Sequence, residues 1–261
     1  MRGALWIVPV ALVAAGCAAR VFTPPAGPAE PFADAPAVWN QATTACRDAQ
    51  RYVAELRVQG WAGKRDQRIA STIAAAVTRT DDVVLEMQVI MGTTVLQMAG
   101  EKGQATILLP LDERVLRAPT RDIVAALTGL QWGGRELLEV LSGCVATPEG
   151  EVTGARIGAL LRVDLSPSTR AWLRERGGQW QLEAAQIGDW VVEYALYEGR
   201  WPREVRVTSA GATPLDLRFT VSQLQVNIDL PPTTFTLNVP ERYLPMTIDE
   251  LRSLGPLKER R

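Results

Sequence analysis

The chain of 261 residues contains no histidine. Histidine is the commonest general base and a frequent zinc ligand, so its absence argues against Ser-His and Cys-His nucleophile pairs and against most zinc chemistry. An enzyme would then need a carboxylate pair, for which Asp81-Asp82 and Glu136-Glu139 are the candidates. Both pairs fit turn and helix-surface charges better. We therefore expect a protein that is not an enzyme and that needs no cofactor or metal.

The chain also lacks an excess of charge of one sign. Its 28 Lys and Arg are scattered among 29 Asp and Glu, for a net charge of −1. Without a basic stripe, nucleic acid is a poor partner. Beyond the N-terminus no apolar run reaches the roughly 18 residues of a membrane helix, so we expect a soluble body.

The N-terminus carries a short apolar run behind a basic residue. Arg2 precedes the apolar stretch from Leu5 to Gly16, and Cys17 ends it. With the small residues of Ala14-Ala15-Gly16-Cys17, the pattern resembles a bacterial lipoprotein signal, although Ala14 stands where this signal usually has Leu. We expect residues 1–16 to be removed and Cys17 to carry the acyl chains that anchor the protein. The alternative is an ordinary cleaved signal or an apolar N-terminal anchor.

Residues 17–36 are predicted to form a tether. Five prolines recur there with Ala and Gly and without an apolar period, which favours extended chain at about 3 Å per residue. Such a tether would hold the body some tens of ångströms from the membrane. By resemblance to Gram-negative lipoproteins, Ala18 in place of Asp favours the outer membrane.

Period-two alternation dominates residues 37–243, which we interpret as one domain. On Tyr52 to Val58, for example, apolar residues alternate with mostly polar ones. Similar runs recur between residues 69 and 118 and between residues 190 and 228. The pattern predicts a mainly β fold: a strongly curved antiparallel sheet, an unclosed barrel of about ten to eleven strands, with an apolar concave face.

Five helices are predicted besides the strands. The first covers residues 38–49, and residues 121–127, 135–141 and 167–177 form three lid helices over the open, concave side. The third lid follows from Ser166-Pro167 as a helix start and Gly177-Gly178 as a stop. A capping box at Thr247 to Glu250 starts a short helix in the C-terminal tail, residues 244–261.

Two cysteines remain once Cys17 is acylated. Cys46 and Cys144 are too few for a thiolate metal site and the right number for one disulfide in an oxidising compartment. Two unpaired buried thiols are the alternative.

Three stretches of the chain resemble the LolA/LolB-like superfamily of outer-membrane lipoprotein proteins. They are residues 54–60, residues 188–194 with the hairpin at Pro202, and residues 227–235 leading to Val239-Pro240. Because this chain is itself a predicted lipoprotein, the LolB-like receptor side is the closer match. The resemblance implies an unclosed barrel of about eleven strands with helices over an apolar cavity that accepts acyl chains. Residues 145–186 form a longer segment than such a receptor leads us to expect.

The resemblance also implies site residues. The inward set predicted to line the lipid cavity is Leu56, Val58, Ile73, Leu85, Met87, Val89, Leu96, Met98, Trp190, Val192, Leu217, Phe219 and Val226. A filled core is the alternative for the same set. Ile90 and Met91, at a predicted turn before Gly92, correspond by the resemblance to a loop that touches the membrane during transfer. Ordinary packing of the turn onto the body is the alternative.

The function expected from these features is binding. A monomeric, lipid-anchored protein on the periplasmic face of the outer membrane would hold acyl chains or lipoprotein lipids by burial alone. It would act in lipoprotein transfer or insertion and could receive its ligand from a periplasmic lipoprotein carrier. Two alternatives remain: a structural lipoprotein with a filled core, and an envelope-assembly or sensor lipoprotein that binds a protein partner.

Overall fold

The computed structural model describes residues 22–63, 68–88, 93–145, 150–211 and 214–255. The predicted lipidation site Cys17, the predicted cavity residue Val89 and the predicted contact residues Ile90 and Met91 lie outside the described residues.

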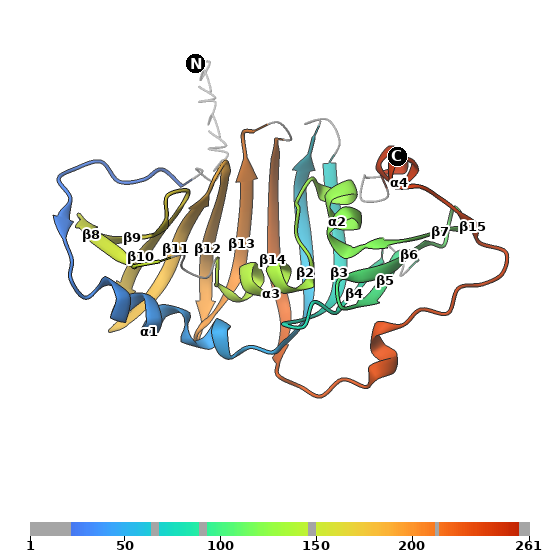
Figure 1. Cartoon of the computed structure of the whole chain (residues 1–261), viewed down its shortest axis with the longest axis horizontal. Helices are drawn as coiled ribbons and strands as arrows, with labels where there is room; N and C mark the ends of the chain where they lie inside the picture. Colours follow the sequence, from blue (N-terminus) through green and yellow to red (C-terminus); the bar gives the residue numbers. More distant parts are fainter. Residues whose placement is uncertain (1–21, 64–67, 89–92, 146–149, 212–213, 256–261) are drawn as a thin grey trace, which may run out of the picture.

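The described chain forms one large sheet of fifteen strands and four α-helices (Figure 1). The first seven strands are β1 (Glu30–Pro31), β2 (Arg51–Ala62), β3 (Arg68–Thr78), β4 (Val83–Gln88), β5 (Thr94–Glu101), β6 (Gln104–Leu109) and β7 (Arg114–Pro119). The others are β8 (Thr153–Ile157), β9 (Leu160–Ser166), β10 (Thr169–Arg176), β11 (Gln179–Ile187), β12 (Trp190–Glu198), β13 (Trp201–Ser209), β14 (Leu215–Val226) and β15 (Leu244–Pro245). The helices are α1 (Ala35–Asp48), α2 (Thr120–Thr128), α3 (Gly134–Ser142) and α4 (Ile248–Leu254), with a short 3₁₀ turn, η2 (Pro232–Phe235).

Two antiparallel meanders make up this sheet. Strands β2 to β7 follow one another, as do β8 to β14, and the two series join where β14 pairs with β2 and Phe219 lies opposite Val58. Within the described residues β1 and β15 form opposite edges, so the sheet is unclosed. Figure 1 shows that it is also curved. The predicted fold class is therefore confirmed in its main feature.

The helices cover one face of the sheet, which we call the inner face. Helix α1 lies against β8, β9 and β11, α3 against β2, β3 and β13, and α2 against β6 and β7. Helix α4 packs on α2. Alternation along the strands supplies the apolar side chains of this face, as the sequence pattern indicates. No helix of the described residues is long and apolar enough to cross a membrane.

The predicted lid helix at residues 167–177 is wrong. Residues 169–176 form strand β10, which pairs with β9 and β11. Gly177 and Gly178 both have positive φ and join β10 to β11 as a two-residue hairpin turn, whose twist suits paired strands. Trp172 and Leu173 point to opposite faces of the sheet, as adjacent strand residues do, and both are buried, which hid the period of two.

The strand count is also higher than the ten to eleven expected. The additional strands come from the long segment before residue 188, which forms β8 to β11, and from the two edges β1 and β15. The long segment therefore widens the sheet and does not add a lid.

The predicted tether is largely part of the folded body. Residues 22–36 lie within the described structure, and β1 pairs with β8 through Glu30 opposite Arg156. Proline is compatible with such an edge strand, because the outward side of an edge needs no N–H donor. The predicted helical tail is likewise integrated: β15 pairs with β7, and Leu251 of α4 is fully buried.

Candidate functional site

The predicted cavity residues meet on the inner face. Eight of them are buried: Leu56, Val58, Met87, Leu96, Met98, Val192, Leu217 and Phe219. Four are half-buried and pack against the same core: Ile73, Leu85, Trp190 and Val226. The structure thus brings together the twelve members that it describes. In this conformation they contact one another and the covering helices as one apolar cluster.

Helices α2 and α3 supply the apolar cover. Leu138 of α3 and Ile123 of α2 are fully buried, and Leu130 between the two helices is almost so. Each helix has one apolar face, which explains why it is stable only against the sheet. The two lids differ in how they are attached.

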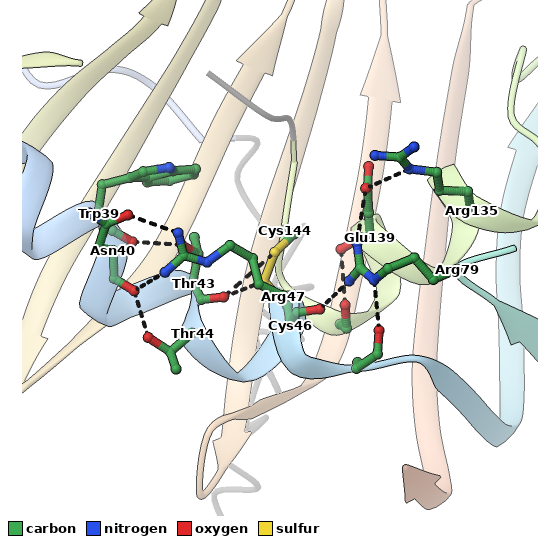
Figure 2. The surroundings of a disulfide bond; sticks show 12 residues. Trp39, Asn40, Thr43, Thr44, Cys46, Arg47, Arg79, Arg135, Glu139 and Cys144 are labelled. Atoms are coloured by element: carbon green, nitrogen blue, oxygen red, sulfur yellow. Dashed lines mark hydrogen bonds and ion pairs between the residues drawn. A yellow bond between two sulfur atoms is a disulfide. The ribbon is translucent and has the colours of Figure 1, made fainter. Parts of the chain in front are cut away.

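Covalent and polar bonds hold the C-terminal end of α3 (Figure 2). Cys46 of α1 and Cys144, just after α3, form a disulfide with Cα atoms 5.7 Å apart. Beside it, the Arg79 guanidinium donates to the carbonyl oxygens of Cys46 at 2.6 Å and Ala49 at 3.0 Å. The same guanidinium pairs with Glu139 of α3 at 3.4 Å. Arg79 therefore links the end of α1 to α3.

The N-terminal end of α3 is fixed by a residue from another part of the chain. Asp81, in the turn between β3 and β4, accepts a hydrogen bond at 3.1 Å from the backbone N–H of Arg135. Gly133 cannot cap the helix with a side chain, so Asp81 takes that role. A Cβ atom at Gly133 would lie only 2.6 Å from the Asp81 carboxylate, so glycine allows this close approach.

The carboxylates of the two pairs considered for catalysis accept hydrogen bonds from neighbouring groups of the protein. Asp82 accepts from the Thr78 and Thr80 hydroxyls and from the Lys102 backbone N–H. Glu136 accepts from the backbone N–H of Gly133. Within the described chain, no group of three or more acidic or cysteine residues could hold a metal ion.

Helix α2 is attached mainly by packing. Its apolar face contacts β6 and β7 while α4 packs on it, and its first residue, Thr120, donates a backbone hydrogen bond to Gly103 at 2.9 Å. Arg121 of α2 and Glu136 of α3 form an ion pair across the two lids.

Half-buried apolar side chains mark the junction of lid and sheet. Leu127, Trp132 and Leu137 belong to the lid, whereas Ile73, Leu85 and Trp190 belong to the sheet. The Trp132 and Trp190 rings are 6.4 Å apart, so they join the connection between the two lids to the start of β12. The Trp132 contact and the Asp81 cap were not predicted, because each depends on pairs distant in sequence.

Two phenols are the main polar groups buried in the core. The hydroxyls of Tyr52 and Tyr194 have no hydrogen-bond partner within the described structure. Burial raises the pKa of both phenols above the ordinary value, so both are neutral at physiological pH. Neither has the depressed pKa of an activated nucleophile, and the surrounding chemistry is that of apolar burial.

Comparisons with known proteins return similarity to solved structures alone. No protein-family profile and no curated protein sequence matches the chain. A LolA superfamily protein from Nitrosomonas europaea matches with a TM-score of 0.49 and 8% identity, over 78% of this chain and 97% of that one.

Two further structures match over similar lengths. A putative outer membrane lipoprotein-sorting protein domain from Vibrio parahaemolyticus has a TM-score of 0.44 and 11% identity, over 76% of this chain and 94% of that one. A DUF1329 family protein from Desulfovibrio piger has a TM-score of 0.46 and 11% identity, over 78% and 98%. The superfamily that the sequence resembles is thus also named among the matching structures.

Proposed function

We propose that this protein is a lipid-anchored binder of acyl chains or lipoprotein lipids, with the inner face of the sheet as its site. The observation that carries the proposal is an apolar inner face covered by helices, one of which, α2, is held mainly by packing. Ligand binding would displace α2 from β6 and β7, and the acyl chain would extend from there along the inner face toward Phe219 on β14. Binding would draw on roughly 25 cal/mol per Å² of apolar surface buried, without a covalent step.

The lid geometry supports this role. Some apolar side chains of the lid and the sheet, such as Leu85 and Trp132, are only half-buried. A ligand could bury the rest of their surface. Methionines at Met87 and Met98 adapt to chains of differing shape. We propose further that the protein is a binder and not an enzyme, acts as a monomer at the outer membrane, and receives its ligand from a periplasmic lipoprotein carrier.

A structural lipoprotein on the same scaffold is the second candidate. The dense burial of the inner set favours it, because eight of the predicted cavity residues are already buried by protein. The two functions differ in one property: only a binder exchanges its lid contacts for ligand contacts.

The test uses Cys17→Ser protein, which lacks the anchor, with palmitate as the probe. We expect saturable palmitate binding, and mass spectrometry should find lipid that copurifies with the protein. Phe219→Glu places a carboxylate on the inner face and should abolish binding in a protein that stays folded.

Gln59→Glu is the matched control. Gln59 is exposed on the outer face of β2, opposite Arg218 and next to Val58, the partner of Phe219. This variant should bind palmitate as the parent does. Absence of both copurified lipid and palmitate binding in the parent protein would overturn the proposal and favour the structural role.

A further inference from the structure

A small apolar cluster lies on the outer face of the sheet, away from the lids. It consists of Leu160, Trp172 and Ala184 from β9, β10 and β11, with Phe22 packed on them. The Phe22 and Trp172 rings are 5.1 Å apart at an interplanar angle of 50°. Trp172 is only 3% exposed and Ala184 is fully buried, so the N-terminal segment covers this part of the outer face.

The same segment is hydrogen-bonded to the sheet. The Phe22 backbone N–H donates to the Glu193 carboxylate on β12 at 2.8 Å. Burial raises the pKa of Glu193, while Arg206 and the Phe22 N–H lower it and favour the carboxylate. This hydrogen bond holds the backbone of Phe22, and the contact with Trp172 holds its ring.

The chain between Phe22 and α1 is held at its far end too. The Phe32 backbone N–H donates to the Gly154 carbonyl at 3.0 Å, next to the pairing of β1 with β8. In Figure 1 this blue segment runs around the β8 edge of the sheet to α1. Residues that the composition predicts to be an extended tether are therefore attached to the sheet at Phe22 and again at Phe32.

We propose that Phe22 shortens the membrane tether to the five residue steps from Cys17 to Phe22, so that the outer face of β9 to β12 lies against the bilayer. This inference rests on the lipid anchor of the proposed function. Five residues span at most about 18 Å when fully extended, whereas the nineteen from Cys17 to Pro36 would span about 65 Å.

The consequence concerns the direction in which the site opens. The sheet lies between the outer-face cluster and the inner-face helices, so a short tether on the outer face turns α2 away from the anchoring membrane. A carrier arriving from the aqueous side then meets the lid first. A long tether would instead let the body tumble and present either face.

Energy transfer measures this orientation on the lipidated full chain. Vesicles of phosphatidylethanolamine and phosphatidylglycerol carry a headgroup acceptor, and the donor sits on a cysteine at Ala195→Cys or Asp122→Cys. Ala195 is exposed on the outer face of β12, and Asp122 is exposed on α2. We expect clearly higher transfer from position 195 than from position 122.

Two changes should abolish that difference. Phe22→Ser removes the ring that covers Trp172, whereas Phe22→Tyr keeps the ring and serves as the matched control. A Gly-Ser spacer of twenty residues inserted after Arg20 lengthens the tether and leaves the docked segment untouched. We expect the difference to be lost with Phe22→Ser and retained with Phe22→Tyr. With the spacer, the difference should also be lost, and transfer should fall at both positions.

The outcomes separate the two proposals. Equal transfer from both positions in vesicle-bound parent protein overturns the short tether while the lipid anchor stands. A difference that survives both Phe22→Ser and the spacer also overturns it, since something else then orients the body. Parent protein that does not float with vesicles overturns the anchor and the short tether together.

Discussion

Helices α2 and α3 are both nine residues long and cover the same inner face, yet they are attached differently. Helix α3 has a disulfide at one end, an aspartate cap at the other and Arg79 between it and α1. Helix α2 relies on apolar packing with β6, β7 and α4. Length and apolar pattern therefore do not determine which lid can move. From this difference we expect α2 to open more readily than α3.

The largest effect on stability is expected when the disulfide between Cys46 and Cys144, at the end of α3, is removed. The double variant Cys46→Ser with Cys144→Ser opens a loop of 98 residues and should lower the free energy of unfolding by about 4 kcal/mol in the chain-entropy model. Denaturant unfolding measures the loss, and Cys17→Ser, which keeps the disulfide, is the control. A change below about 1 kcal/mol would remove the main distinction between the lids.

The next test removes equal amounts of buried apolar surface from each lid. Leu138→Ala on α3 should cost about 3 kcal/mol of global stability, because a cavity remains where the frame cannot collapse. Ile123→Ala on α2 should cost less globally and instead speed amide exchange over residues 120–128. Similar global losses with unchanged exchange in α2 would show that both lids unfold only with the whole domain.

A smaller effect is expected at the cap of α3. Asp81→Ala removes the acceptor for the Arg135 N–H and should cost about 1 kcal/mol, measured as a lower melting temperature. Asp81 has a φ of 67°, which Asn tolerates, so Asp81→Asn is the control and should retain most of the stability. If both variants melt together, lost charge and not lost capping explains the result.

The smallest effect concerns the ion pair between the lids. Arg121→Ala removes the partner of Glu136, and the two side chains are 54% and 35% exposed. The change in stability should not exceed about 0.5 kcal/mol and should vanish at high salt. A larger, salt-independent loss would mean that the two lids move as one unit.

Alternation was the most reliable guide to the fold. Strands such as β2 and β14 keep a strict period of two over most of their length, and their inward residues do lie together on the inner face. The helical lids were also predictable, because Leu138 and its neighbours form one apolar stripe on a short helix. Strand β10 was mistaken for a helix because Ser166-Pro167 and Gly177-Gly178 suit a hairpin strand as well as a helix.

Local pattern determined which residues face inward, because side-chain direction along a strand or helix depends only on the backbone period. The tertiary structure alone decided how each lid is attached and where the N-terminal segment lies. Asp81 caps a helix that begins more than fifty residues later, and Phe22 reaches Trp172 across 150 residues of chain. Such contacts depend on which strands become neighbours in the folded sheet, and the residues around each partner carry no periodic signal of it.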